Sequence, residues 1–247
     1  IIVRQSILRW PVQTEILKKN IIGKPFYSVK RRAKYLILEN ENGSLIIHLG
    51  MSGNLRVIDS NISPNKHDHI DILFQDSTIL RYYDPRRFGS FHWAKNPLLH
   101  PLIINLGPEP LSNNFSGKYL FDRSRKRKQS VKNFIMDGKI VSGIGNIYAS
   151  EVLFEAGIKP SKSAGSISLK LYISLVESIR KILKNSIKKG GTTLRDFVNI
   201  ENKPGYFKQQ LKVYGREGKE CRKCKNLLKQ MIIGQRSSVY CPKCQTY

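Results

Sequence analysis

Four cysteines near the end of the sequence form its clearest chemical pattern. They occur as two Cys-x-x-Cys pairs, Cys221 with Cys224 and Cys241 with Cys244, separated by sixteen residues. Two such pairs can place four thiolates around one tetrahedral metal ion, as in a zinc ribbon or a hairpin finger. Two local disulfides or a redox pair are the alternatives, but redox chemistry needs only one pair, and we see no secretory leader that would indicate an oxidising compartment. The cysteines therefore predict one structural zinc ion.

The charge of the chain predicts a polyanionic partner. The sequence has 43 Lys and Arg against 18 Asp and Glu, a formal charge of +25. Nucleic acid fits this charge best, because each neutralised phosphate releases counterions. A membrane surface is the weaker alternative, because we find no apolar run of about eighteen residues and no lipidation motif. A proteome rich in Lys and Ile would also raise the charge without any function.

The first part of the chain, from Ile1 to about Trp93, is predicted to be β-rich. Short apolar runs alternate with turn clusters such as Glu41-Asn-Gly43. The runs are Tyr35–Leu38, Leu45–Leu49, Ile70–Phe74 and Thr78–Tyr83. Strands at this spacing favour a β-sandwich or barrel.

The later part of the chain is predicted to be helical. Apolar residues recur at helical spacing from Tyr172 to Ile187, after a serine-rich cap near Ser168 and before Gly190-Gly191. The other face of this helix, which includes Arg180, is expected to be solvated. A shorter helix should begin near Asn146, after two glycines, and its free backbone N–H groups could bind a phosphate. Two helices separated by turns are a credible duplex-gripping unit in so basic a protein.

The basic run 123–128 and several longer motifs complete the pattern. The run, Arg-Ser-Arg-Lys-Arg-Lys, is read as a solvated or phosphate-touching segment. The motifs are 31–35 (RRAKY), 48–53 (HLGMSG), 66–69 (KHDH), 84–89 (DPRRFG), 143–151 (GIGNIYASE), 190–197 (GGTTLRDF), 203–207 (KPGYF) and the four cysteines. Through these motifs essentially the whole chain resembles the formamidopyrimidine-DNA glycosylases, which remove oxidised purines from DNA in bacteria.

The resemblance implies base flipping, in which the damaged nucleotide leaves the duplex for a pocket. Met51 and Phe88 match side chains that fill the vacated space, and Arg86 matches the one that bonds the orphaned cytosine. Lys34 corresponds to the proton donor for β-elimination. Arg236 corresponds to an arginine that enters the minor groove and is assigned proton donation for δ-elimination, although a guanidinium holds a phosphate better than it releases a proton.

Further positions follow from the same resemblance. His67, Arg86 and Arg127 match DNA-contact positions, and Lys132 and Asn146 match phosphate-binding ones. The stretch from Arg195 to Phe207 corresponds to a loop that closes over the flipped base, and its Gly and Pro content fits a mobile lid.

The predicted fold is therefore α+β in two domains, with a β-sandwich followed by a helix-two-turn-helix domain that carries a four-cysteine zinc finger β-hairpin. We place the sandwich at 1–95, a linker with four prolines at 96–110, the helical domain at 111–211 and the finger at 212–247. The expected partner is double-stranded DNA with oxidised purines, bound by a monomer in the bacterial cytoplasm.

The start of the sequence departs from the family pattern. The family's nucleophile is an N-terminal proline followed by a catalytic glutamate, whereas this sequence begins Ile1-Ile-Val-Arg4. We therefore expect a fragment or truncated reading frame that binds damaged DNA without cleaving it efficiently. The alternatives are a parent enzyme with both glycosylase and lyase activity, a lesion or duplex binder that begins here, and a generic transcription-associated zinc protein.

Overall fold

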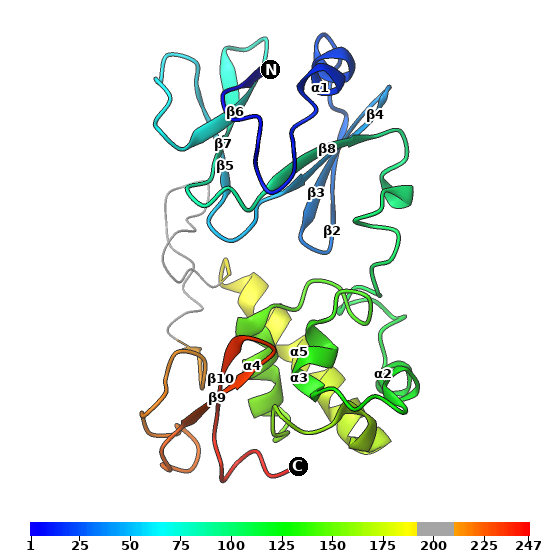
Figure 1. Cartoon of the computed structure of the whole chain (residues 1–247), viewed down its shortest axis with the longest axis vertical. Helices are drawn as coiled ribbons and strands as arrows, with labels where there is room; N and C mark the ends of the chain where they lie inside the picture. The colour runs from blue at the N-terminus through cyan, green and yellow to red at the C-terminus, as the bar shows by residue number, and fades with distance from the viewer. Residues whose placement is uncertain (192–209) are drawn as a thin grey trace. The chain divides into compact units, whose positions relative to one another are not determined.

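The structure, a computed structural model, describes residues 1–191 and 210–247 of the chain. The described residues divide into two compact units, 1–104 and 105–191 with 210–247. In Figure 1 the first unit runs from blue to green and the second from green to red. The division falls inside the segment 96–110 that we predicted as a linker.

The first unit contains two antiparallel four-stranded sheets. One sheet has the strand order β1-β6-β7-β5 and the other β2-β3-β4-β8. The strands are β1 Ile2–Val3, β2 Ser28–Arg32, β3 Tyr35–Asn40, β4 Gly43–His48, β5 Asn54–Asp59, β6 Asp68–Leu73, β7 Thr78–Tyr83 and β8 Ser90–Ala94, followed by the short 3-10 helix Pro97–Leu99. The four apolar runs that predicted strands lie in β3, β4, β6 and β7, which confirms the β-rich character of this part.

One apolar core joins the two sheets of this unit. Leu45 from β4 and Ile70 from β6 belong to the same buried cluster, so the sheets pack face to face as a sandwich. Helix α1, Thr14–Ile21, adds Leu17 and Ile21 to this core. The sequence did not predict α1, because a helix of eight residues with two buried side chains leaves almost no periodic signal.

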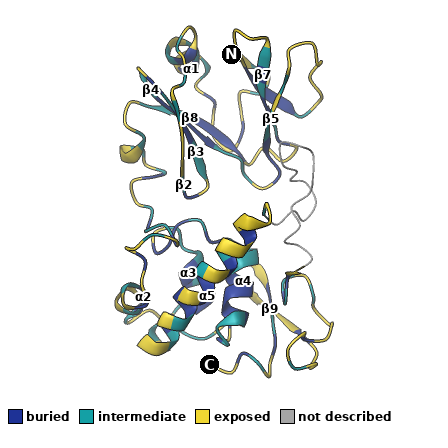
Figure 2. Ribbon diagram, turned by 180° about the vertical axis from the view of Figure 1, so that it is seen from behind, coloured by how far each residue is buried: buried dark blue, intermediate teal, exposed yellow. Residues whose placement is uncertain are grey.

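The second unit is built on helices. They are α2 Gly117–Ser124, α3 Val131–Met136, α4 Asn146–Glu155, the 3-10 helix Ala164–Ser166 and α5 Leu169–Lys188. Of these, α4 and α5 begin where the sequence predicted. The Ser168 hydroxyl accepts a hydrogen bond from Leu171 N–H and caps α5 as expected. Figure 2 shows α5 buried along one face and exposed along the other. Ile187 is the exception to the predicted apolar face, since it is 67% exposed in the last turn.

Two arginines bind backbone carbonyls inside this unit: Arg180, which we predicted as solvated, and Arg125, from the run that we predicted as solvated or phosphate-touching. The Arg180 guanidinium donates to the Ser112 carbonyl at 3.1 Å and to the Phe115 carbonyl at 2.7 Å. Arg125, from the basic run, donates to the Ile167 carbonyl at 2.9 Å. The prediction was wrong for these two side chains because their carbonyl partners are distant in sequence and leave no local pattern.

A β-hairpin completes the second unit. It consists of β9, Lys229–Ile233, and β10, Arg236–Tyr240, joined by a two-residue turn. Apolar residues of the cysteine region, among them Val239, pack against Phe154 of α4. The segment predicted as a separate finger therefore shares a core with the helices.

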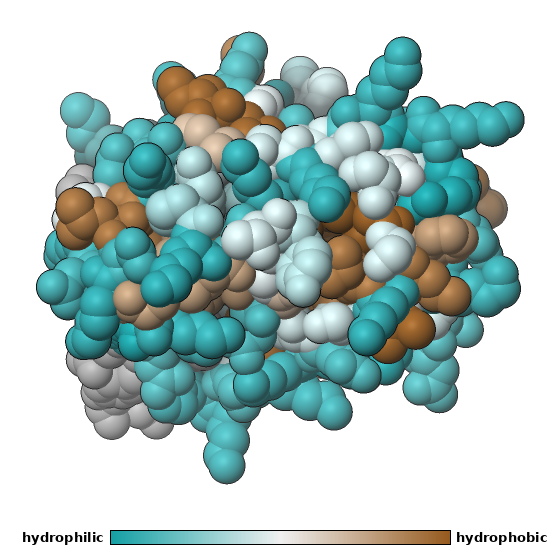
Figure 3. All heavy atoms as spheres, turned by 90° about the horizontal axis from the view of Figure 1, so that it is seen from below, coloured by the Kyte–Doolittle hydropathy of each residue, from teal (hydrophilic) through white to brown (hydrophobic). Residues whose placement is uncertain are grey.

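Polar side chains dominate much of the outer surface. The face in Figure 3 carries mainly hydrophilic residues, many of them long side chains that project outward, with smaller apolar patches between them. Throughout residues 1–191 and 210–247, each helix is too short or too polar to span a bilayer. The fold class predicted from the sequence is confirmed.

Candidate nucleic-acid interface

Strand register gathers three predicted residues at one end of the sheet β2-β3-β4-β8. Tyr35, His48 and Ser90 lie side by side on β3, β4 and β8. In the sequence, Lys34 directly precedes Tyr35, Met51 lies three residues after His48, and Phe88 lies two residues before Ser90. All three therefore emerge from the same end of the sheet.

The second sheet brings His67 and Arg86 to that same end of the sandwich. Asn54 pairs with Tyr83, and Tyr83 pairs with Asp68. His67 directly precedes β6, and Arg86 lies three residues after the end of β7. The segment 49–53 joins β4 to β5 and the segment 84–89 joins β7 to β8, so both connections cross between the sheets here.

Lys34 occupies the tight turn between β2 and β3. Ala33 and Lys34 form this two-residue turn, and Ala33 takes a positive φ of 54°. The Lys34 side chain is exposed. Its charge is felt by His48, because burial lowers the pKa of His48 and the positive charges of Lys34 and Arg9 lower it further.

His48 is a site residue that we did not select from the sequence. Its Nδ1 accepts a hydrogen bond from Gly50 N–H at 3.0 Å, so the neutral ring carries its proton on Nε2. The Tyr35 ring lies 5.0 Å from the imidazole, centroid to centroid. The position of His48 at the start of the motif 48–53 was the sequence feature that could have identified it. The ring adds an N–H donor to this end of the sheet, and the charge of Lys34 acts on it.

Met51, Arg86 and Phe88 lie on two loops that touch each other. Met51 is 70% exposed and Phe88 is 42% exposed, large values for apolar side chains. The Arg86 guanidinium carbon lies 4.6 Å from the centroid of the Phe88 ring, a cation–π contact. A Cβ atom on Gly50 would lie 2.6 Å from the Phe88 carbonyl carbon, so the two loop backbones are in direct contact. The structure thus brings Arg86 and Phe88 into contact and places Met51 on the loop that touches theirs.

His67 lies beside these loops. Its carbonyl accepts a hydrogen bond from Asp84 N–H at 3.0 Å. Its ring meets the Tyr83 ring edge to face, with centroids 5.9 Å apart. His67 therefore flanks the loop that carries Arg86.

In the second unit the hairpin that carries Arg236 is fastened to two helices. Arg236 is exposed at the start of β10. The Lys132 ammonium, from α3, donates to the Ser237 carbonyl at 3.0 Å and to the Ser238 hydroxyl at 2.6 Å. The Asn146 amide, from α4, donates to the same Ser237 carbonyl at 3.2 Å. Lys132, Asn146 and the hairpin therefore form one assembly.

The Lys132 ammonium is fully buried in this assembly. Burial lowers the pKa of Lys132 to about 8, and the positive charge of Arg236 contributes. Both of its hydrogen-bond partners are groups of the hairpin. The phosphate-binding role stays a prediction, and the contacts support a role in holding Arg236 in place.

Helix α4 begins at Asn146, as the sequence predicted, and a phosphate-binding role of its N-terminus stays a prediction. Gly143 has a φ of 83°, and Gly145 caps the helix without a side-chain hydrogen bond. The Asn146 Oδ1 atom is buried and has no hydrogen-bond partner in the part of the chain that the structure describes. Free N–H groups at a helix start favour a phosphate.

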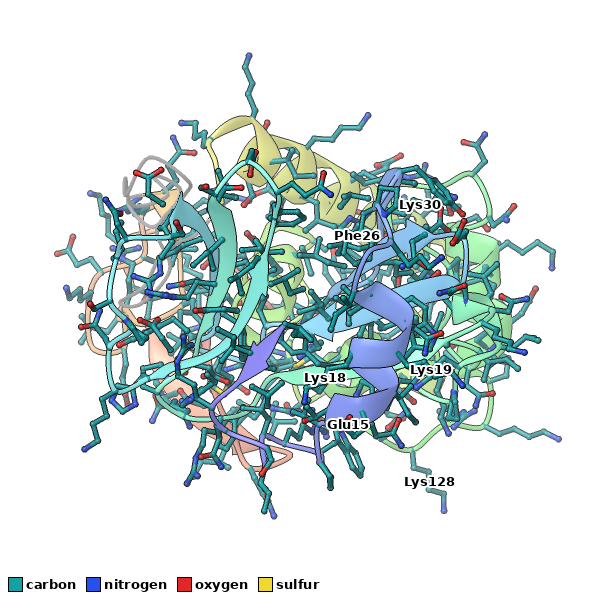
Figure 4. The ribbon with its side chains drawn as sticks, turned by 90° about the horizontal axis from the view of Figure 1, so that it is seen from above. Glu15, Lys18, Lys19, Phe26, Lys30 and Lys128 are labelled. Atoms are coloured by element: carbon teal, nitrogen blue, oxygen red, sulfur yellow. The ribbon has the colours of Figure 1, made fainter. Side chains whose placement is uncertain are left out.

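Arg127 lies in the basic segment between α2 and α3. Its guanidinium is exposed, while its carbonyl accepts hydrogen bonds from Gly165 N–H and the Ser163 hydroxyl, both at 2.9 Å. Lys128 points away from the ribbon in Figure 4. The backbone of this segment is held by these bonds, and Lys126, Arg127 and Lys128 are exposed while Arg125 binds inward. The predicted loop from Arg195 to Phe207 lies outside the described residues.

The four cysteines form a site that fits zinc. Their sulfur atoms all lie within 4.8 Å of one another, with 3.9 Å between Cys221 and Cys244 and 3.4 Å between Cys224 and Cys241. A tetrahedral zinc–thiolate site with bonds of about 2.3 Å requires sulfur–sulfur distances of about 3.8 Å. Within each pair a backbone N–H points at the first sulfur. The donor set and its spacing match the predicted zinc ion.

A buried glutamate binds the chain segment that precedes the first cysteine pair. The Glu151 carboxylate, on α4, is 2% exposed. It accepts hydrogen bonds from the backbone N–H groups of Lys212 at 2.8 Å, Val213 at 2.9 Å and Tyr214 at 2.8 Å. One side chain therefore fixes the backbone that leads to the first cysteine pair.

A depression at the opposite end of the sandwich is less suited to nucleic acid. It measures about 640 Å³ and lies at the turn between β3 and β4. Glu39 and Glu41 line it, each paired with a lysine. These ion pairs leave no net positive charge to attract a polyanion, whereas the loop end carries the exposed cations Lys34 and Arg86.

Three protein-family models match the chain. The formamidopyrimidine-DNA glycosylase N-terminal domain matches residues 1–91, the formamidopyrimidine-DNA glycosylase H2TH domain matches 106–198, and the zinc finger found in FPG and IleRS matches 218–246. Together the models cover the sandwich, most of the helical unit and the cysteine hairpin. The zinc-finger match and the sulfur geometry agree on one structural zinc ion.

Two curated relatives have the same name. Formamidopyrimidine-DNA glycosylase of Pseudomonas aeruginosa (strain LESB58) is 54% identical over 245 residues, which are 99% of this chain and 90% of that protein. The protein of the same name from Photobacterium profundum is 50% identical over the same shares.

Solved structures of FPG proteins are also similar to this chain. A mutant Lactococcus lactis FPG bound to Fapy-dG containing DNA is 32% identical, with a TM-score of 0.89 over 96% of this chain and 88% of that chain. The Lactococcus lactis Fpg complex with abasic-site DNA has the same identity and TM-score over 99% and 92%. MutM (FPG) from Thermus thermophilus is 32% identical, with a TM-score of 0.82 over 90% and 84%.

Proposed function

The chain belongs to the formamidopyrimidine-DNA glycosylase family, and we propose that it removes oxidised purines from double-stranded DNA. The family is a DNA glycosylase family of base-excision repair. Our proposal adds the substrate class, 8-oxoguanine and formamidopyrimidines, and an AP lyase step through a Schiff base. It also places the protein, as a monomer, on the DNA of a bacterial cytoplasm.

The gathering of exposed side chains at one end of the sandwich carries the proposal. An exposed methionine and an exposed phenylalanine on touching loops are costly in water and suited to a gap in a base stack. Arg86 lies beside them with donors that could meet a base edge. In this assignment Met51 and Phe88 fill the space of the extruded nucleotide, and Arg86 bonds the opposite cytosine.

The cationic groups would hold the DNA backbone near the reacting sugar. Lys34 is placed on a rigid turn beside the His48 ring, where an ammonium and an imidazole N–H can both donate to a phosphate oxygen. Lys34 would also supply the proton for β-elimination. The family's amine nucleophile is not among the residues that we assign.

The second unit would bind phosphates and the minor groove. Arg236 is presented at the tip of a hairpin that Lys132 and Asn146 hold. The N-terminus of α4 and the Arg127 segment add phosphate donors. The four cysteines would hold a zinc ion that cross-links the base of the hairpin.

Borohydride trapping tests this proposal. The protein expressed from its full reading frame should form a covalent adduct with a duplex that contains 8-oxoguanine opposite cytosine, because borohydride reduces a Schiff base to a stable amine. The same duplex without the lesion is the control. No adduct, with no release of the oxidised base, would remove the glycosylase and lyase assignment.

A duplex binder that lacks base excision is the second candidate. The charge of +25 and the hairpin assembly of the second unit would serve such a protein without any chemistry. It would bind intact and damaged duplexes with the same affinity at matched salt.

A further inference from the structure

One buried carboxylate connects the two loops that carry Met51, Arg86 and Phe88. Asp84 has no exposed surface. Its Oδ1 accepts a hydrogen bond from the Ser52 hydroxyl at 2.7 Å and a longer one, 3.3 Å, from Arg86 N–H. Its Oδ2 accepts from the Tyr82 hydroxyl at 2.8 Å and from Gly89 N–H at 2.9 Å.

These four donors belong to both loops and to the sheet between them. Ser52 directly follows Met51 in the loop 49–53. Arg86 and Gly89 belong to the loop 84–89. Tyr82 lies on β7, in the core of the sandwich. A single side chain therefore relates the positions of both loops to the sheet.

The backbone of Asp84 is held as firmly as its side chain. Its N–H donates to the His67 carbonyl at 3.0 Å, and its carbonyl accepts from His69 Nε2–H at 2.8 Å. Its carboxylate stays charged in this setting. Burial by itself would raise the pKa of Asp84, but the hydrogen bonds from Ser52, Gly89 and Tyr82 outweigh burial and lower that pKa.

Two glycines make the loops a single unit around this carboxylate. Gly50 has a φ of 73°, and a Cβ atom there would collide with the Phe88 and Gly89 backbone. A Cβ atom on Gly89 would collide with the Tyr82 hydroxyl that donates to Asp84. Neither loop can shift without moving the other or breaking a bond to Asp84.

We propose that Asp84 is the positioning residue of the stack-invading side chains: it fixes Met51, Arg86 and Phe88 in one arrangement and so sets the preference for the base opposite the lesion without touching DNA. This inference rests on the proposed function. A buried carboxylate destabilises the folded state unless it is fully hydrogen-bonded, and apolar residues in its place would give a more stable interior. What Asp84 provides is the fixed geometry of side chains that must enter a duplex together.

Asp84→Asn tests the inference on the full chain. The amide keeps one acceptor oxygen and places an NH₂ group against two of the present donors. We expect the preference for cytosine opposite a tetrahydrofuran abasic analogue, over adenine, to fall about tenfold, because a bond to a charged acceptor is lost. The ratio of dissociation constants for the four opposite bases, from fluorescence anisotropy, measures this. Affinity for intact duplex should stay unchanged, because phosphate contacts dominate it.

A second variant and a matched control separate positioning from folding. Ser52→Ala removes one donor, spares the carboxylate and should reduce the same preference by a smaller factor; it decides the matter if Asp84→Asn does not fold. Asp71→Asn is the control, because Asp71 is also buried in this unit but binds Arg81 and Arg4 instead of the loops. It should lower the melting temperature and keep the preference.

The outcomes distinguish this inference from the proposed function. Wild-type preference retained in both Asp84→Asn and Ser52→Ala overturns the inference and leaves the proposed function standing. An equal loss in Asp71→Asn also overturns it, because any damage to the sandwich would then suffice. A wild-type protein that ignores both the lesion and the opposite base overturns the proposed function itself.

Discussion

Replacing Glu151 by Gln should free one backbone amide out of three. Gln has nearly the shape of Glu but only one acceptor oxygen. If that oxygen takes the place of Oε1, it keeps the bonds from Val213 and Tyr214 N–H, and the new NH₂ group faces Lys212 N–H. Lys212 N–H then loses a charged acceptor and faces a donor, which costs about 2 kcal/mol.

Hydrogen–deuterium exchange, measured for each amide by NMR, gives this cost directly. About 2 kcal/mol corresponds to roughly thirtyfold faster exchange at Lys212. Val213 and Tyr214, which keep an acceptor, should change much less. Glu155→Gln is the matched control, because Glu155 lies one turn further along α4 and binds only the ammonium group of Lys212 in this segment.

The reasoning would be refuted in either of two ways. Unchanged exchange at Lys212 in the Glu151→Gln protein would mean that the carboxylate does not hold this segment. Equal acceleration in the Glu155→Gln protein would mean that the segment responds to any loss of charge on α4.

The remaining predictions concern the metal, the opposite base, the hairpin and pH. Cys241→Ser should release the zinc ion and weaken duplex binding while the sandwich melts as before; unchanged zinc content would reject the site. Arg86→Ala should cost roughly 1–3 kcal/mol of discrimination among opposite bases, measured as binding ratios. Lys132→Met should weaken duplex binding but change the free energy of unfolding by less than about 2 kcal/mol in denaturant titrations. The substitution removes hydrogen bonds of the ammonium, which destabilises the fold, but it also removes the unfavourable burial of a charge, which stabilises it. His92 should titrate near pH 4 by NMR, because burial and neighbouring imidazoles lower its pKa to about 4. The unfolded state therefore binds this proton at a higher pH than the folded state, and the free energy of unfolding should fall as the pH drops from about 6.5 to 4. This fall should be smaller in the His92→Gln protein.

Local patterns explain what the sequence could predict. The spacing of Cys221, Cys224, Cys241 and Cys244 specifies a metal site because the ligands of each pair are three residues apart. The cap at Ser168 and the apolar repeat after it locate a helix for similar reasons. The exposed positions of Met51 and Phe88 came from the family resemblance, since an apolar residue alone predicts burial.

Contacts between distant residues explain what it could not predict. Ser52 and Asp84 are 32 positions apart, and Lys132 and Ser238 are 106 apart. No short window holds both members of either pair. The anchoring of Arg180 was missed for the same reason, because its carbonyl partners precede Arg180 by more than sixty residues. Register and strand order had to be known first.

The most direct measurement is the affinity of the zinc-loaded protein for two duplexes that differ only by one 8-oxoguanine, across a series of salt concentrations. Tighter binding to the damaged duplex at every salt concentration, with similar salt dependence for both, is the predicted result, because phosphate contacts are shared and the stack-invading side chains act only at the lesion. Identical affinities for the two duplexes would contradict the account.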